Sequence, residues 1–119
     1  MTDSILLLSA RRTPIGAFQG VLAPATAPQL GAAALAAAVH SAGVSANDVQ
    51  EVIMGCVLPA GLGQAPARQA ALSAGIPRSV PTTTINKMCG SGMKALMMAI
   101  DQLRAGDAEV IAEIGRAHV

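Results

Sequence analysis

Aromatic side chains and charged side chains are both scarce in this sequence of 119 residues. Phe18 is the single aromatic residue, and charged residues make up 13% of the chain, whereas an average globular domain carries about 25%. Eight basic residues against seven acidic ones leave a net charge of +1. A nucleic-acid-binding protein needs basic residues that neutralise phosphates and aromatic rings on which bases stack. The sequence therefore predicts that no nucleic acid is a partner.

Long apolar runs and an N-terminal export signal are also lacking. The longest uncharged stretch of small apolar residues covers residues 30–39, about half of the ~20 residues that a transmembrane helix requires. An acidic residue, Asp3, precedes the apolar run at residues 5–8, and the pair Arg11 and Arg12 follows it. Secretory and twin-arginine signals have basic residues ahead of the apolar run instead. We expect a cytoplasmic protein that has no membrane partner.

The chain holds only two cysteines, Cys56 and Cys89, and is rich in apolar residues. Without a secretory signal, two cysteines argue against a disulfide-stapled scaffold. Hydrophobic residues make up 52% of the sequence, which excludes intrinsic disorder because disordered chains are poor in them. Many are alanines, which bury little area each, and burial contributes only about 25 cal/mol per Å². The composition favours a domain that packs against another one, or a piece of a larger protein.

Apolar runs and helical patterns alternate along the chain. Short runs of apolar or β-branched residues predict strands, and periodic segments closed by a glycine predict helices. The predicted strands cover residues 4–9, 51–57, 81–85 and 110–112, and the predicted helices cover about residues 28–42, 66–74 and 89–105. In the last helix, Leu96, Ile100 and Leu103 share one face. The order β-α-β-α-β-α-β is typical of an α/β fold with a mainly parallel sheet and right-handed crossovers.

The segment after the third predicted strand holds the candidate chemistry. Ligands of open parallel sheets bind at the carboxyl ends of the strands, and Cys89 stands there, at the first turn of a predicted helix, with Gly90 and Gly92 beside it. A helix N-terminus favours a thiolate, and its free N–H groups can hold an oxyanion. The glycines would let a bulky substrate approach the backbone. Cys89 is thus a candidate nucleophile for a thioester, and the alternative is a small buried hydrophobic residue.

The other candidate residues have simpler interpretations. Cys56 lies within an apolar strand and is expected to be a buried structural residue. His40 is expected on the surface near the end of a helix, and it has no partner at metal-ligand spacing, so no metal site is predicted. A cluster of four methionines is expected to fill the core and an interface, or alternatively to line a substrate channel. Its members are Met88, Met93, Met97 and Met98.

Three segments resemble the thiolase family. The run Asn86-Lys87-Met88-Cys89-Gly90-Ser91-Gly92-Met93-Lys94-Ala95 looks like the acyl-enzyme cysteine motif of that family. Residues 10–16 are similar to its opening strand and turn, and residues 52–70 are similar to its second strand and the loop that follows. The likeness covers nearly everything from residue 5 to residue 112, and it is strongest to the acetyl-CoA acetyltransferase branch.

The resemblance implies both a fold and a reaction. It implies two similar α/β halves, of which this one supplies the nucleophile Cys89, with backbone groups of Cys89, Gly90 and Gly92 at the oxyanion. Cys89 would take the acetyl group from acetyl-CoA as a thioester, and a second acetyl-CoA would accept it to give acetoacetyl-CoA, reversibly. The resemblance implies homo-dimers or tetramers, with residues 82–84 near the subunit contact. Coenzyme A thioesters would be substrates, and no cofactor or metal would be needed.

The sequence also departs from the family. Members are much longer, and their second half supplies a histidine that activates the nucleophile and a second cysteine that acts as acid and base. His40, His118 and Cys56 match neither, so we expect this chain to be inactive alone. A non-catalytic α/β module that binds acyl-CoA or assembles with a partner is the alternative function.

The last seven residues are a separate case. The family continues into a glycine-rich turn followed by Met, Glu and Ser, whereas residues 113–119 read Glu-Ile-Gly-Arg-Ala-His-Val. This heptapeptide resembles one reading frame of a common sequencing-adapter oligonucleotide. We expect residues 1–112 to be a truncated thiolase N-terminal domain and residues 113–119 to be a tail from outside the family, which long-read sequencing of the locus would test.

Overall fold

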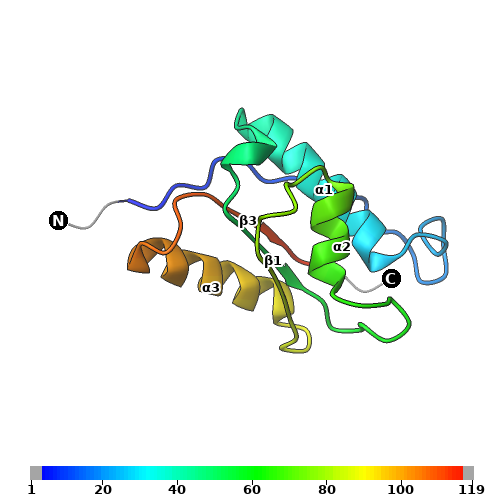
Figure 1. Cartoon of the computed structure of the whole chain (residues 1–119). Helices are drawn as coiled ribbons and strands as arrows, with labels where there is room; N and C mark the ends of the chain where they lie inside the picture. The colour runs from blue at the N-terminus through cyan, green and yellow to red at the C-terminus, as the bar shows by residue number, and fades with distance from the viewer. Residues whose placement is uncertain (1–3, 117–119) are drawn as a thin grey trace.

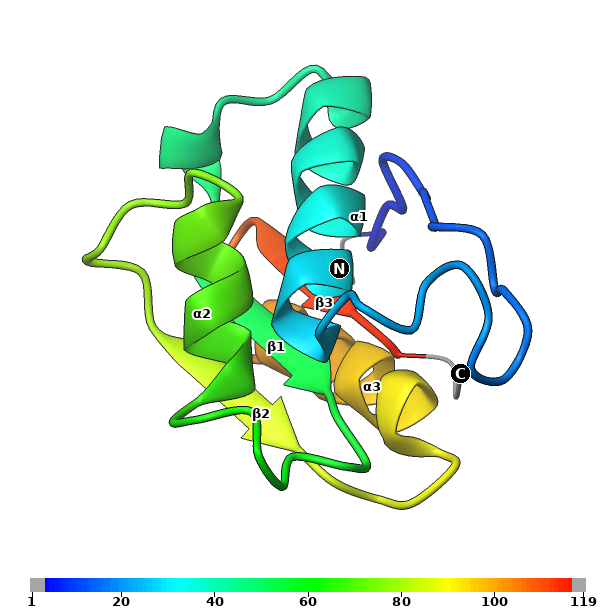
Figure 2. The same cartoon turned by 90° about the vertical axis from the view of Figure 1, so that its right-hand side faces the viewer.

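A computed structural model describes residues 4–116 of the chain. In this part of the chain, helices cover both faces of a parallel sheet (Figures 1 and 2). The helices are α1 (Ala27–Ala42), α2 (Pro66–Ser73) and α3 (Ser91–Ala105), with a short 3-10 helix η1 (Ala46–Asp48). The strands are β1 (Glu51–Gly55), β2 (Thr82–Ile85) and β3 (Ile111–Ile114). The predicted α/β alternation is confirmed from α1 onward, within a few residues at each boundary.

The strand order in the sheet is β2-β1-β3, and both pairs are parallel. Met54 of β1 pairs with Thr84 on one side and with Ile114 on the other. Parallel neighbours require a crossover between them, and α2 and α3 lie in the connections that follow β1 and β2. As a result, all three strands end at one edge of the sheet.

The two faces of β1 pack against different helices. Val52 and Met54 are fully buried in a core cluster that includes residues of α1 and α2. Ile53 points to the opposite face and packs with Ala95 and Ala99 of α3. Successive side chains of a strand alternate between faces, and β1 is apolar on both because helices cover both. The alanines let these helices approach the sheet closely.

Local signals fix the ends of α1. Thr26 is its N-cap: the Thr26 hydroxyl oxygen accepts from the Gln29 backbone N–H at 3.3 Å, and the Gln29 side-chain oxygen accepts from the Thr26 backbone N–H at 2.8 Å. This reciprocal pair is a capping box. At the other end, Gly43 adopts a left-handed conformation with φ of 72°, which a glycine does without strain. The predicted helix over residues 28–42 is confirmed.

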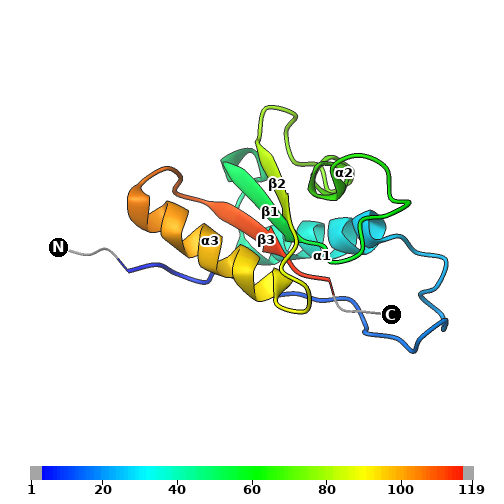
Figure 3. The same cartoon turned by 90° about the horizontal axis from the view of Figure 1, so that it is seen from below.

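The first predicted strand is wrong. Residues 4–9 belong to no strand, and the side chains of Leu6 and Leu7 are 72% and 78% exposed. A hollow of about 1070 Å³, lined by this segment, α1, α3 and β3, separates it from the free edge of β3. Figure 3 shows the segment outside the sheet on that side. A strand needs hydrogen-bonding partners along its length, whereas one bond from the Ser9 hydroxyl to the Ala38 carbonyl oxygen, 2.6 Å, holds this segment.

The last strand extends further than the sequence predicts. It continues through Glu113 and Ile114, and Ile114 is buried in the same cluster as Met54. These are the first two residues of the segment 113–119 that the sequence assigns to a tail, and residues 117–119 lie outside the described part of the chain. Between residues 4 and 116, no helix combines the length and the apolarity that a membrane crossing needs.

Candidate active site

The candidate nucleophile lies where the sequence predicts it, at the edge where the strands end. Asn86 follows β2 directly, and the turn 86–90 leads from it into α3. Figure 2 shows this turn beside the arrowheads of β1 and β2. The Asn86 side-chain N–H group donates to the carbonyl oxygen of Val57, 3.3 Å away, which ties this turn to the loop after β1. Within the turn, Cys89 is exposed and is a free thiol.

Helix α3 begins at Ser91 with Gly90 as its N-cap. Cys89 therefore lies just before the N-cap, two residues ahead of the helix, and not in its first turn as the sequence predicts. The N–H group of Gly90 donates to the Lys87 carbonyl at 3.0 Å, and that of Ser91 donates to the Met88 carbonyl at 3.1 Å. No side chain caps the helix. The first N–H groups of a helix lack intrahelical acceptors and carry a partial positive charge, so the uncapped end can stabilise negative charge that develops near the thiol.

The residue before Cys89 is strained. Met88 has a φ of 49°, in the left-handed region, which costs a residue with a Cβ atom about 1–3 kcal/mol. Its N–H group donates to the Asn86 side-chain oxygen at 3.0 Å, and its carbonyl oxygen accepts from the Ser91 hydroxyl at 2.6 Å. The Ser91 hydroxyl oxygen also accepts from the Lys87 N–H group at 2.9 Å. Side chains on both sides therefore hold this turn.

Glycines bring the start of α3 onto the strand ends. A Cβ atom on Gly55 would lie 2.5 Å from the carbonyl carbon of Ser91, and one on Gly92 would lie 3.1 Å from the Cα of Gly115. Real Cβ atoms essentially never come within 3.0 Å of another atom, so Gly55 is required by packing. Gly92 was predicted to admit substrate, but its close neighbour is the protein's own backbone. A Cβ on Gly90 would meet its nearest atom at an ordinary 3.5 Å.

The remaining predicted residues lie away from this edge or in the core. Cys56 is 0% exposed, as its structural interpretation requires. His40 is exposed in the last turn of α1, as predicted, and α1 ends near the start of β1, at the sheet edge opposite Cys89 (Figure 2). His118 lies outside the described residues. Within residues 4–116, no group of His, Cys, Asp or Glu side chains is placed to hold a metal ion.

The methionine cluster is not a core feature. Met88 is 70% exposed, Met93 65% and Met97 48%, so the core prediction is wrong for these three. Met98 alone of the four packs against the cluster of Ile53. The first turn of α3 therefore carries apolar side chains at its surface next to Cys89.

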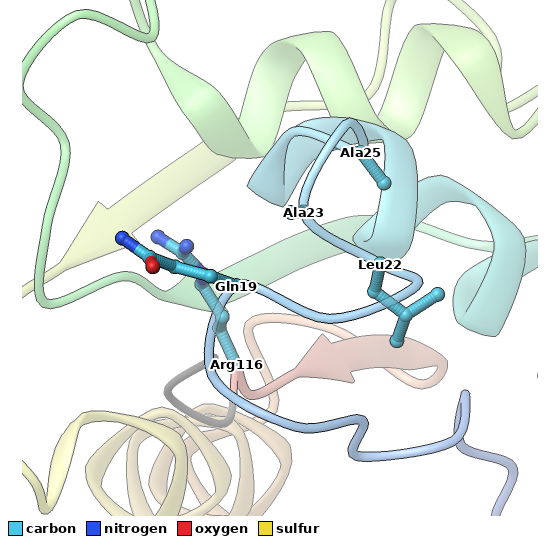
Figure 4. Close-up of a pocket in the computed structure, with 5 residues that line it drawn as sticks. All are labelled: Gln19, Leu22, Ala23, Ala25 and Arg116. Carbon is cyan, nitrogen blue, oxygen red and sulfur yellow. The ribbon is translucent and has the colours of Figure 1, made fainter.

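Cys89 lines neither of two hollows that the structure shows among residues 4–116. The smaller one measures about 190 Å³ and lies between the loop before α1 and the end of β3 (Figure 4). Its lining residues are Gln19, Leu22, Ala23, Ala25 and Arg116. The larger one is the gap beside β3, and the predicted helix face of Leu96, Ile100 and Leu103 lines it instead of packing on the sheet.

Glu113 is the described ionisable group that burial affects most clearly. It lines the larger hollow, and one of its carboxylate oxygens is buried without a hydrogen-bond partner among residues 4–116. This burial raises the pKa of Glu113 to about 7, because a charged carboxylate loses its hydration there. In register, Glu113 lies opposite Ile53 in the middle of β1, so it is not at the edge that holds Cys89.

Comparison with known proteins gives consistent matches. Residues 5–118 match the family described as the thiolase N-terminal domain. An acetyl-CoA acetyltransferase of Cupriavidus necator is 53% identical over the whole chain, and one of Pseudomonas aeruginosa is 50% identical over 98% of it. The crystal structure of the Acat5 thiolase from Ascaris suum in complex with coenzyme A matches 83% of the chain, with a TM-score of 0.82 and 40% identity. The chain spans 30% of the length of both bacterial relatives and 26% of that solved chain.

Proposed function

The chain belongs to the thiolase family, and from that membership we propose that it contributes the acyl-accepting Cys89 of an acetyl-CoA C-acetyltransferase. The observation that carries the proposal is the exposed Cys89 thiol at the uncapped start of α3, inside the motif 86–95. The identity of about half of all residues to acetyl-CoA acetyltransferases supports the choice of acetyl-CoA as substrate. The coenzyme A bound to the solved thiolase supports a thioester of this carrier.

The proposed chemistry has two steps. In the first, the Cys89 sulfur attacks the thioester carbon of acetyl-CoA, the bond from that carbon to the coenzyme A sulfur breaks, and the acetyl group becomes a thioester of Cys89. In the second, the methyl carbon of another acetyl-CoA loses a proton and attacks this thioester, which releases the Cys89 thiolate and forms acetoacetyl-CoA. The N–H groups of Gly90 and Ser91 already donate within the turn, so the next N–H groups at the start of α3, from Gly92 onward, would stabilise the oxyanion of each tetrahedral intermediate.

The proton transfers need groups that this part of the chain does not place at the site. His40 is the one histidine among residues 4–116, and it lies at the opposite sheet edge. We therefore propose that a base outside these residues accepts the proton of the Cys89 thiol. The isolated chain should form little acetoacetyl-CoA, and efficient turnover by the purified chain would contradict this.

Acetyl transfer to Cys89 tests the proposal directly. Alkylation is a weaker test, because burial alone protects Cys56 from a reagent. The folded chain is incubated with acetyl-CoA over a long time course, because transfer without the outside base is slow, and is then digested and analysed by mass spectrometry. We expect an acetyl group on the peptide that contains Cys89, removable by neutral hydroxylamine as a thioester is, and absent from Cys89→Ser.

Cys56→Ala is the matched control, because it removes the other free thiol and leaves residues 86–90 unchanged in sequence. It should keep the label. A chain that binds acetyl-CoA, as calorimetry would measure, but forms no thioester at Cys89 would instead support the non-catalytic acyl-CoA-binding module. Acetylation spread over lysines alone would contradict the proposal as well.

We also propose that the chain assembles as the family resemblance implies. β2 is an edge strand of the sheet, and an unpaired edge is a surface on which another chain can pair. The residues Thr82, Thr83 and Thr84 lie on this strand and are half-buried. Sedimentation of the chain at several concentrations would detect a dimer or tetramer.

A further inference from the structure

We propose that Ser91 is a positioning residue for Cys89. Its hydroxyl group holds the strained turn in front of the nucleophile, so that the thiol faces the open end of α3 in one fixed geometry. This inference rests on the proposed function, because it concerns how Cys89 accepts an acyl group. It adds a residue whose role neither the motif nor the composition reveals.

The environment of Ser91 is unusual for a serine in this chain. Among residues 4–116 it is the one polar residue that is buried, with 5% of its surface exposed. Buried hydroxyl groups need partners for both their donor and their acceptor functions. Ser91 uses both within the same turn: it accepts from the Lys87 N–H group and donates to the Met88 carbonyl. Its side chain thus connects the two residues that precede Cys89.

The strain at Met88 explains why such a connection is needed. A left-handed φ of 49° at a residue with a Cβ atom persists only when the surroundings hold it. The Met88 side chain is 70% exposed, so packing does not hold it. The Asn86 side chain holds the Met88 N–H group. The Met88 carbonyl oxygen accepts from the Ser91 hydroxyl at 2.6 Å and, more distantly, from the Ser91 backbone N–H group at 3.1 Å. Loss of the Ser91 hydroxyl would let Met88 relax toward an ordinary φ and turn Cys89 with it.

Of the two side chains that hold Met88, that of Ser91 connects the turn to helix α3. Asn86 is the first residue of the turn 86–90, and its side chain also donates to the Val57 carbonyl, whereas Ser91 is the first residue of α3. Its backbone is itself fixed, because Gly55 packs against it at a distance that excludes a Cβ atom. Ser91 therefore fixes the position of Cys89 relative to the sheet, because its side chain bonds the turn and its backbone packs on β1.

The experiment measures the initial rate of acetyl transfer from acetyl-CoA to Cys89 and, separately, its alkylation by iodoacetamide. For Ser91→Ala we expect acetyl transfer to fall by at least about tenfold, because small misplacements of a reacting group cost that much or more. Alkylation by the small reagent should change little, since the thiol stays exposed. Protection of Cys56 from iodoacetamide reports that the chain remains folded.

A double variant separates positioning from general damage. Glycine adopts a left-handed φ without strain, so Met88→Gly combined with Ser91→Ala should recover most of the acetyl transfer lost in Ser91→Ala. Ser73→Ala, which removes an exposed serine at the end of α2, should match the unaltered chain. Either an unchanged rate in Ser91→Ala, or no recovery in the folded double variant, would overturn the role of Ser91. Absence of the Cys89 thioester in the unaltered chain would instead overturn the proposed function, and this inference with it.

Discussion

The buried side chain of Glu113 makes the stability of the folded chain depend on pH. Its carboxylate lies beside a hollow with a buried oxygen that lacks a hydrogen-bond partner among residues 4–116. A charged group without a partner is disfavoured there, so the neutral form is retained to a higher pH than in the unfolded chain. The same arrangement gives the molecule a group that titrates near neutrality.

The stability of the chain should therefore fall as the pH rises. The pKa of Glu113 moves from 4.5 to about 7 on folding, so the folded state binds this proton more tightly than the unfolded state does. Its contribution is fully present below about pH 4.5 and is lost as the pH rises through about 7. Glu113→Gln cannot ionise and should lose less stability over this range in urea unfolding. Glu109→Gln, at an exposed site, should keep the loss, and equal pH profiles for all three chains would contradict the assignment.

Residue identity predicted some site features and missed others. The position of Cys89 at the strand ends could be predicted because it follows a predicted strand and precedes a predicted helix in sequence. Cys56 and His40 could be predicted because an apolar strand buries its members and a helix end tolerates a basic residue. Ser91 could not, since a serine in a glycine-rich turn gives no signal of burial. The strain at Met88 depends on contacts made after folding, which composition does not encode.

At the scale of elements, the seating of α3 on the sheet fixes the site. Gly55 ends β1, and its missing side chain leaves room for the Ser91 backbone. Gly92 and Gly115 repeat this arrangement between α3 and the end of β3. Because Cys89 directly precedes this contact, the glycines set where the thiol lies relative to the strand ends.

Gly55→Ala should be destabilising. The new Cβ atom would lie 2.5 Å from backbone carbon of Ser91, and backbone cannot rotate aside as a flexible side chain can. Overpacking of this kind typically costs about 1–3 kcal/mol. Thermal or urea unfolding measures it, with Gly90→Ala as control, because that Cβ meets its nearest atom at 3.5 Å and should change stability by at most about 0.5 kcal/mol. Equal costs for both variants would mean that α3 is not seated as described.

Elements with local signals could be predicted, and the one that depends on a distant partner could not. α1 has a capping box at Thr26 and a glycine stop at Gly43, both readable from neighbouring residues. The run 4–9 has the composition of a strand, but strand formation requires a partner that the described residues do not place beside it. The face of Leu96, Ile100 and Leu103 has helical spacing, yet it lines the hollow. Periodicity therefore predicted the helix and not what covers it.

At the scale of the whole molecule, apolar surface is left uncovered. The large hollow is lined by apolar residues of α1, α3 and the N-terminal segment, and Leu6, Leu7 and Val21 are more than two-thirds exposed. Contiguous exposed apolar surface marks a place where another polypeptide packs. The high hydrophobic content of the sequence therefore includes apolar side chains that the described residues leave exposed.

The isolated chain should therefore associate with itself and bind an apolar dye. We expect strong fluorescence of anilinonaphthalene sulfonate and species larger than a monomer in sedimentation, because exposed apolar surface is removed from water by association. Leu7→Asn, which removes a side chain that is 78% exposed, should lower the fluorescence. A stable monomer with little dye binding would contradict this reading of the surface.

The central position of β1 in the sheet has a consequence for biosynthesis. β1 pairs with β3 across a separation from Glu51 to Ile111, and contacts between residues so distant in sequence form slowly. During translation, Cys89 leaves the ribosome before Gly115, whose backbone meets Gly92 at the start of α3. The nascent thiol therefore exists for a time without the packing that fixes it. A chaperone that covers the nascent β1 during this interval would protect the segment around Cys89 as well as the sheet.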